Sequence, residues 1–550
     1  GGRSLLTYTA ASGPVWAGGT GNWTTGFTTA PTNGASIAFT GAGGTATNDI
    51  PTGTLTTVGD IEFRSGAGAY TLAADAGAAG ASGGTALTVN GSIINSSSAT
   101  QTINTDLAFA ATRTIAATTG NITIGGAISG AGGLTKNGSN KLTLTAANTY
   151  TGDTTINTGT LEIGSGSTTG SLSSSSAITN NASLVFNRSN DLTVSNTIGG
   201  TGNLTKSGAG TLTLSGSSNY SGTTTISVGA LRATHANALG STAAGTTVAS
   251  GAALELSGGI SIGAEALSLS GTGISSGGAL RNISGDNSYA GAITLAAATL
   301  INSDSGNLTL SGIISGSNSL TKNGSGRLTL SATNTYTGGT TINGGTLAFT
   351  DGTTSAIGNG TITINNGSTL SLTKSRFENQ SIIFGSSGGG NLTTAYSGIR
   401  FSGSTIYTTG GSTNFISGST LDISIPTFNV AEGTDDVDLQ VSNLIQRGGI
   451  TKSGAGKLLL TNNNAFNVGA THYTITINAG ALEIGATGRL VSGSYAGNIN
   501  NQGTFIYSGN NAQTLSGVIF ASGALTQNAA STLTLAGNNT YTGTTTINAG

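Results

Sequence analysis

The sequence has few charged residues. Asp, Glu, Lys and Arg make up 7% of its 550 residues, against roughly 25% in an ordinary soluble domain. The formal net charge is −2, and basic residues occur singly, as at Lys136, Lys206 and Lys322. Because a nucleic-acid-binding face needs clustered basic residues, we expect no nucleic-acid partner. Disorder normally accompanies high net charge, so the near-neutral balance also argues against a flexible linker.

Cysteine is absent from the sequence. A chain that crosses an oxidising compartment unfolded benefits from this, because no premature disulfide can form. Compositional drift in a Gly/Thr/Ser-rich repeat is the alternative explanation. No apolar run approaches the roughly 18–20 residues of a membrane-spanning helix. The chain begins Gly1-Gly2-Arg3 without a signal peptide, so we expect a mature or excised segment.

In place of charge the chain has 92 glycines and many Thr, Ser and Asn residues that alternate with Leu, Ile and Val. Leu142 and Leu144 flank Thr143, and Leu161 and Ile163 flank Glu162. This period of two is typical of strands with one apolar face. Gly, Asn and Ser turn signals bound each strand after three to five residues. Such short strands cannot form a sandwich of ordinary dimensions, but they fit the sides of a coil.

One sequence block recurs along the chain. Its first copy reads Leu134-Thr135-Lys136-Asn137-Gly138, then Leu-Thr-Leu, Asn-Thr-Tyr-Thr-Gly, Thr-Thr-Ile-Asn and Gly-Thr-Leu-Glu-Ile up to Ile163. Further copies start at Leu204, Leu320, Ile450 and Leu525, and a degenerate half-copy lies at 287–291. The fourth copy has a longer turn and carries Phe466 where the others have Tyr. Irregular spacing of the copies indicates one kind of coil inserted among more divergent coils.

The block resembles the autotransporter-associated β-strand repeat of bacterial passenger domains. The opening Trp16-Ala17-Gly18-Gly19-Thr20-Gly21-Asn22-Trp23 also resembles the start of such passengers. The resemblance implies a right-handed parallel β-helix that is exported to the extracellular or outer-membrane surface of a Gram-negative-type bacterium. It further implies roles in adhesion, aggregation or surface structure.

The predicted fold class is therefore all-β, a right-handed parallel β-helix (β-solenoid). We predict roughly 20–27 coils, since repeats of roughly 20–25 residues would give about 22–27 of them. Apolar residues point inward, Thr and Ser point outward, Asn forms ladders at corners, and Gly supplies the positive φ of sharp turns. We predict four regions: 1–60, an N-terminal cap or junction; 61–350, solenoid with repeat blocks; 351–449, irregular coils or protruding loops; and 450–550, solenoid continuing past the end of the chain.

Two side chains of the block suggest a role of their own. The lysine at its third position (Lys136, Lys206, Lys322, Lys452) is interpreted as a solvated residue that discourages lateral sheet association, with a ligand-facing basic ladder as the alternative. The tyrosine (Tyr150, Tyr220, Tyr336, Tyr541) is interpreted as a ring packed over the turn, with stacking on carbohydrate as the alternative.

A catalytic constellation is not recognisable. The two histidines, His235 and His472, lie far apart in sequence in variable turns, and neither a phosphate loop nor a nucleophile motif is present. The acidic cluster Glu432, Asp435, Asp436 and Asp438 is interpreted as a solvated loop, with a weak cation site as the alternative. We predict no catalytic, cofactor-binding or metal-binding residues and no cofactor. Segments 375–380 and 423–428 interrupt the repeat and are the best places for specific binding, although irregular coil is the preferred interpretation.

The functional prediction is a non-enzymatic extracellular rod that acts in cell-surface adhesion or aggregation. Its expected partners are other cells, surface polysaccharide or copies of itself, through end-to-end or lateral self-association. The alternative is a structural subunit of an extracellular fibre or sheath. A β-helix carbohydrate-active enzyme is a remote alternative. The sequence stops at Gly550 inside a block, which we interpret as truncation of a longer protein or as a surface that another chain continues.

Overall fold

A computed structural model describes most of the chain. The described residues are 5–9, 23–24, 33–48, 56–74, 85–350, 358, 360–365, 367–373, 376–378, 380–386, 388–395, 399–402, 404–424 and 426–550. They belong to two compact units, Gly1–Leu267 and Ser268–Gly550. In the predicted N-terminal region, β1 (Leu5–Thr9) pairs antiparallel with β2 (Trp23–Thr24) and parallel with β3 (Ser36–Thr40). The passenger-like stretch between Trp16 and Asn22 lies outside the described residues.

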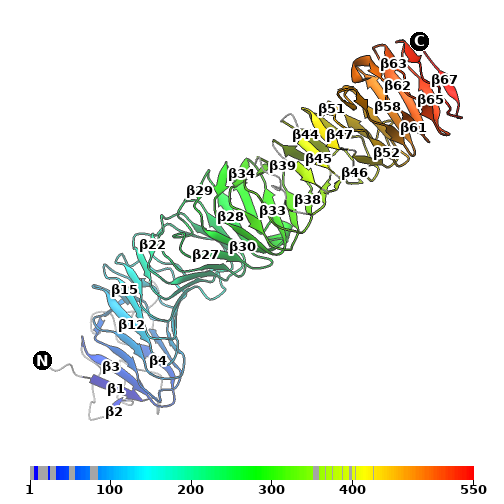
Figure 1. Ribbon diagram of the computed structural model, residues 1–550. Coiled ribbons are helices and arrows are strands. Elements are labelled where there is room, and N and C mark those ends of the chain that lie inside the picture. Colours follow the sequence, from blue (N-terminus) through cyan, green and yellow to red (C-terminus); the bar gives the residue numbers. More distant parts are fainter. Residues whose placement is uncertain are drawn as a thin grey trace. The chain divides into compact units, whose positions relative to one another are not determined.

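The fold is an all-β parallel solenoid of about 21 turns, which confirms the predicted class. In the described part of the chain, the only helices are two short 3-10 turns, η1 (Ile274–Ser276) and η2 (Val491–Gly493). Figure 1 shows the stacking of coils within the second unit from β33 (Ile293–Ser303, green) to β67 (Thr545–Ile547, red). Among the described residues, no helix has the length and apolar character needed to cross a membrane.

Besides three further short strands in the longer turn of the fourth block, the first four blocks share four short strands from two successive coils, and the fifth block contributes three. They are β15 (Leu134–Asn137), β16 (Lys141–Leu144), β17 (Thr154–Ile156) and β18 (Thr160–Ile163); β23 (Asn203–Lys206), β24 (Thr211–Leu214), β25 (Thr224–Ile226) and β26 (Ala230–Ala233); β36 (Leu320–Asn323), β37 (Arg327–Leu330), β38 (Thr340–Ile342) and β39 (Thr346–Phe349); β52 (Thr451–Ser453), β53 (Lys457–Leu460), β57 (Ile475–Ile477) and β58 (Ala481–Ala486); and β65 (Ala524–Gln527), β66 (Leu533–Leu535) and β67.

A block stacks on itself. β15 pairs in parallel with β17, so that Lys136 lies beside Ile156, and β16 pairs with β18, so that Leu142 lies beside Leu161. The same pairing joins β36 to β38 and β37 to β39. A block therefore contains the strands of two coils that pair with each other. This matters for stability, because one turn of a solenoid buries too little apolar surface on its own.

The parallel ladders continue through residues 351–449. One ladder runs from β38 through β40 (Ile362–Ile364), β43 (Ile382–Phe384), β46 (Thr405–Thr408) and β49 (Thr427–Val430) to β52. A second runs from β39 through β41 (Thr369–Leu372), β44 (Asn391–Thr394), β47 (Asn414–Gly418) and β50 (Leu439–Val441) to β53. A third side is formed by β42 (Arg376–Glu378), β45 (Ile399–Ser402), β48 (Leu421–Ser424) and β51 (Ile445–Gln446). The division of the chain into four regions stays a prediction.

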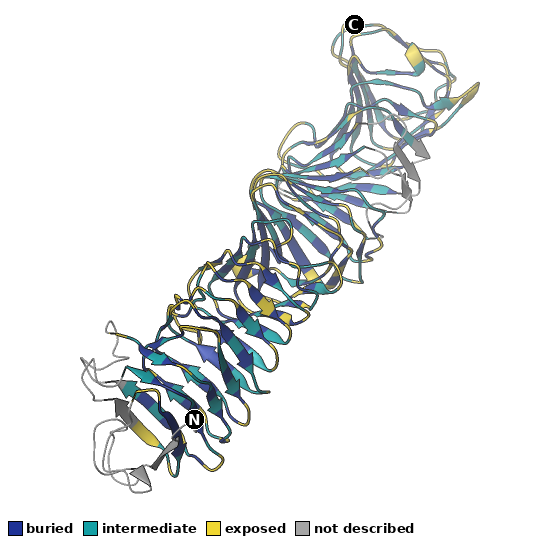
Figure 2. Ribbon diagram, turned by 90° about the vertical axis from the view of Figure 1, so that its left-hand side faces the viewer, coloured by how far each residue is buried: buried dark blue, intermediate teal, exposed yellow. Residues whose placement is uncertain are grey.

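The core is a set of columns of apolar side chains. Leu142, Leu161, Leu184 and Leu204 occupy successive rungs, and all four are fully buried. Figure 2 shows buried and partly exposed residues alternating along the strands, as a period of two requires. At the corners, the predicted asparagine ladder is present: Nδ2 of Asn343 donates to Oδ1 of Asn323 at 3.0 Å, and Nδ2 of Asn365 donates to Oδ1 of Asn343 at 3.0 Å.

Candidate functional site

The lysine of the block points into the solenoid. Lys136, Lys206, Lys322 and Lys452 are each at most 2% exposed, so the interpretation as a solvated residue is wrong, and a basic ladder facing a ligand is excluded as well. In Leu134-Thr135-Lys136, the lysine is two positions after a leucine and therefore lies on the same, inward face of the strand. The ammonium group lies among backbone carbonyl groups at a corner of the coil.

Backbone carbonyl groups surround the buried ammonium group. In the third block, Nζ of Lys322 donates to the carbonyl oxygens of Asn323 (2.8 Å) and Gly324 (2.9 Å), and to that of Gly344 (3.0 Å) on the next coil. Lys136 and Lys452 repeat this arrangement. Burial lowers the pKa of Lys322 to about 8. The lysine thus holds two successive corners together from the inside.

The tyrosine of the block is also part of the core. The rings of Tyr150, Tyr220 and Tyr336 are fully buried, which excludes the carbohydrate-stacking alternative for these three. Each hydroxyl lies within hydrogen-bond distance of the threonine hydroxyl four residues later, as in Tyr336–Thr340 at 2.7 Å. Burial raises the pKa of Tyr336 above its usual range. In the fourth copy, Phe466 and Ile475 replace the two members of this pair, so among the five full copies the tyrosine and threonine hydroxyls are either both present or both absent.

This pairing predicts a non-additive effect of mutations in the third block. Tyr336→Phe leaves the Thr340 hydroxyl without this partner and should cost about 1–2 kcal/mol of unfolding free energy. Tyr336→Phe with Thr340→Val should cost less than the sum of the two single substitutions, by about 1 kcal/mol. Urea unfolding of the four proteins completes the cycle. Additive losses would show that the two hydroxyls are not coupled.

A ladder of threonines covers the outer face of the block strands. On three successive rungs, Thr155 lies between Thr135 and Thr179. In the same way, Thr225 lies between Thr205 and Thr247, and Thr341 lies between Thr321 and Thr363. Neighbouring strands of a sheet are about 4.8 Å apart, so each block presents regularly spaced hydroxyl groups. This threonine ladder is the candidate functional surface.

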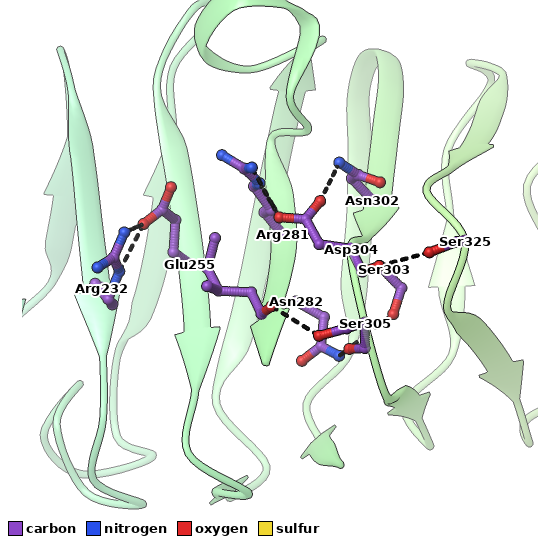
Figure 3. Close-up of polar contacts among 10 residues, drawn as sticks. Arg232, Glu255, Arg281, Asn282, Asn302, Ser303, Asp304, Ser305 and Ser325 are labelled. Carbon is purple, nitrogen blue, oxygen red and sulfur yellow. Dashed lines mark hydrogen bonds and ion pairs between the residues drawn. The ribbon is translucent and has the colours of Figure 1, made fainter. Parts of the chain in front are cut away.

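Ion pairs lie on another part of the outer face. In the first unit, the guanidinium of Arg232 contacts Oε2 of Glu255 through Nη2 at 2.7 Å and Nε at 2.8 Å. In the second unit, Arg281 contacts Oδ2 of Asp304 at the same two distances, and Asn302 donates to Oδ1 of Asp304 at 2.7 Å (Figure 3). Both pairs join neighbouring coils, so they contribute to coil stacking. The Arg281–Asp304 pair is partly exposed, and such pairs are typically worth up to about 1 kcal/mol, whereas Glu255 in the other pair is buried.

The acidic cluster contains both an exposed carboxylate and a buried one that accepts backbone hydrogen bonds. Asp436 is exposed, as predicted, and accepts a contact from Nζ of Lys457 at 2.9 Å. Asp438 is buried, so the interpretation as a solvated loop is wrong for this residue; it accepts from the backbone N–H groups of Gly433 (2.6 Å) and Lys457 (2.7 Å). Hydrogen bonds from Thr413 lower the pKa of Asp435. In the described part of the chain, no group of three or more His, Cys, Asp or Glu side chains could hold a metal ion.

The remaining candidates from the sequence lie apart from one another in the chain. His235 and His472 fall in different units. Nδ1 of His235 accepts from the backbone N–H of Asn237 at 3.1 Å, whereas His472 packs edge-on against Tyr495. Segment 375–380 contributes β42, but Ser375 and Asn379 lie outside the described residues. In segment 423–428, Phe428 is buried and Ile425 lies outside the described residues.

The sequence pattern did not single out Glu265, a buried carboxyl group of the first unit. It is 3% exposed, and its Oε1 accepts a hydrogen bond from the Thr246 hydroxyl at 2.6 Å. Burial raises its pKa from 4.5 to about 7, and the Glu265 carboxylate adds to the effect of burial in raising the pKa of Tyr220. A glutamate in a Gly-Ala-Glu turn gives no sequence signal of burial.

Glu265 should make the stability of the chain depend on pH. The folded state holds its proton more tightly than the unfolded state, so the stabilisation is complete below about pH 4.5 and is lost as the pH rises through about 7. One pKa unit corresponds to about 1.4 kcal/mol, which makes the expected loss on the order of 3 kcal/mol. Urea unfolding at pH 5 and pH 8 should show this loss in the native chain and not in Glu265→Gln. An equal pH effect in both proteins would contradict the assignment.

Comparison with protein families identifies the block. The passenger-associated-transport-repeat family matches residues 134–163, 204–233, 282–301, 320–349, 450–484 and 525–550. The matches include all five copies of the block, and the match over 282–301 contains the half-copy. Comparison with curated proteins gave no match, and comparison with solved structures gave none. Repeats of this family suggest a structural or surface role and imply surface or extracellular exposure in Gram-negative bacteria.

Proposed function

We propose that this chain, an autotransporter passenger with β-repeats on a parallel β-solenoid, is a non-enzymatic surface rod that mediates adhesion or aggregation of cells. The threonine ladder is the observation that carries the proposal. It repeats in each block, it faces outward, and the strands beneath it are held in register by the buried lysine and leucine columns. A regular array of uncharged hydroxyl groups suits many weak hydrogen bonds with another polar surface.

Low charge supports the same role. With 7% charged residues and a net charge of −2, two copies of the chain repel each other weakly, and so do the chain and a neutral polysaccharide. Weak contacts repeated along an extended surface add up through multivalency. Other cells, surface polysaccharide and copies of the chain are therefore the proposed partners.

Coated particles provide the test. Beads carrying the chain should clump with one another or with bacterial cells, whereas albumin-coated beads should not. Replacing Thr155, Thr225 and Thr341 by Glu places one charge on the ladder of each of three blocks and should reduce clumping at least fivefold. The matched control places Glu at Ser139, Ser217 and Thr335, which are exposed turn residues of the same blocks.

Two outcomes would overturn the proposal: clumping no greater than that of albumin-coated beads, or an equal loss in the ladder and turn variants. Electron microscopy of the native material separates adhesion from the fibre alternative. Discrete rods of uniform length favour an adhesive passenger, whereas continuous filaments favour a structural subunit.

A further inference from the structure

The fourth block contains a hairpin that the third block lacks. Its family match spans 450–484 and that of the third block spans 320–349, which is 35 against 30 residues. In the fourth block, β55 (Asn467–Val468) pairs antiparallel with β56 (Thr471–His472), and Gly469 has a φ of +58° at the tip. This hairpin is the longer turn predicted from the sequence. In repeat proteins, insertions of this kind map to one face, which is often the binding face.

The hairpin is held firmly at its base. The backbone N–H of Tyr473 donates to the carbonyl oxygen of the buried Phe466 at 3.0 Å. The hydroxyl of the buried Tyr495 donates to the carbonyl oxygen of Tyr473, and the Tyr495 ring lies against His472 with a centroid distance of 5.8 Å. These contacts fix the backbone of Tyr473 beside the outer face of the solenoid.

A pocket lies at the base of the hairpin, with a volume of about 320 Å³ and a lining of Gly449, Thr451, Tyr473, Thr474 and Thr476. Thr451 and Thr476 occupy adjacent rungs of β52 and β57 and belong to the threonine ladder. At Gly449, a Cβ atom would lie 2.2 Å from the carbonyl oxygen of Thr474 and 3.3 Å from Cβ of Tyr473. A side chain there would therefore displace this wall of the pocket.

We propose that this pocket binds one ring of a neutral carbohydrate, packed against Tyr473. The lining residues are one tyrosine, three threonines and one glycine, and none of them is charged. A pyranose has an apolar face of C–H groups, which fits the negatively polarised face of an aromatic ring, and a rim of hydroxyls, which can exchange hydrogen bonds with threonine. The volume is at the lower end of the 300–1,000 Å³ typical of small-molecule sites, and it suits a single ring with its neighbours in the chain lying outside.

The proposal rests on the proposed surface role and makes it more specific. It assigns a ligand class, neutral polysaccharide, to one block. The third block provides the internal contrast: Thr341 occupies the ladder position that corresponds to Thr476, but the turn before it is short and its tyrosine, Tyr336, is buried in the core. A nucleic acid or an acidic glycan would need basic residues that this lining does not contain.

Calorimetric titration of the full chain with three neutral glycans, dextran, mannan and cellohexaose, tests the proposal, with polygalacturonate as the anionic comparison. We expect at least one neutral glycan to bind. Tyr473→Ala should weaken that binding at least tenfold. Thr476→Val, which keeps the branched shape and removes the hydroxyl, should weaken it about threefold. Thr335→Val is the matched control, because Thr335 is an exposed turn threonine of the third block outside the ladder, and it should leave binding unchanged.

Failure of the glycan titration can be told apart from failure of the clumping assay. No binding of any neutral glycan, tighter binding of polygalacturonate, or equal effects of Thr476→Val and Thr335→Val would overturn the pocket, whatever the coated beads do. If Tyr473→Ala perturbs the hairpin, as judged by amide exchange at residues 467–473, the comparison of the two threonine variants decides. Clumping that persists after the loss of glycan binding would leave the surface role intact and assign it to the ladder alone.

Discussion

Replacing Gly159 with alanine should destabilise the first block by about 3–5 kcal/mol, because two costs add at this position. Gly159 has a φ of +72°, which alanine adopts only with strain. A Cβ atom would also lie 2.4 Å from the carbonyl oxygen of Gly138, 2.6 Å from that of Asn140 and 2.8 Å from Nζ of Lys136. The turn has no room to move away, since the two carbonyl groups belong to the preceding coil.

Gly251 provides the control for backbone strain alone. Its φ is +83°, but a Cβ atom there would meet nothing within 4 Å. Gly251→Ala should therefore cost only about 1–2 kcal/mol. Solenoids unfold by local units. The loss of stability in the Gly159 variant is therefore measured both by urea unfolding and by amide exchange in β15 to β18. Equal losses in the two variants would show that conformation, and not close approach to the preceding coil, is what requires glycine at position 159.

The fold was predictable because the block repeats the same physical rule. Alternation at Leu142-Thr143-Leu144 predicts a strand with one buried face, and the structure stacks Leu142 on Leu161 in that orientation. The asparagine ladder and the positive φ of turn glycines also follow from the sequence, because few other residues satisfy those positions. The number of turns, about 21, falls within the predicted range.

The inward direction of the lysines was missed although the sequence contained it. Lys136 stands two residues after Leu134, so the period of two already places both on the buried face. The interpretation as a solvated residue gave the charge more weight than the period. That weighting fails here because the corner supplies three carbonyl acceptors, one of them from the next coil. A contact made across coils is not visible in a local sequence window.

The pocket beside Tyr473 could not have been predicted in detail. The sequence shows that the fourth block has extra residues, and this indicates a longer turn. It does not show that the turn folds into a hairpin, nor that Tyr473 lines a pocket with Thr451 of an earlier strand. Segments 375–380 and 423–428 interrupt the repeat in sequence, but their described strands, in β42, β48 and β49, continue the parallel ladders.

Replacing Lys322 with methionine should destabilise the third block by about 3–5 kcal/mol. Methionine fills similar space, but it removes the donor that three carbonyl groups share, and each hydrogen bond to a charged group is worth about 1.5–3 kcal/mol. The contribution is less than the sum of the three, because burial of the ammonium group carries its own cost. Urea unfolding with amide exchange in β36 to β39 measures the loss.

Lys322→Gln separates the hydrogen bonds from the charge. The fifth copy of the block has Gln527 at this position, where Nε2 donates to the carbonyl oxygens of Ala529 (2.7 Å) and Ser531 (2.5 Å). Glutamine should therefore recover about half of the stability that methionine loses. Arg327→Met removes a partly exposed charge from the same block and should cost less than about 1 kcal/mol. If Lys322→Met costs no more than Arg327→Met, the buried ammonium group does not hold the corners together, and the leucine columns alone account for the register of the threonine ladder.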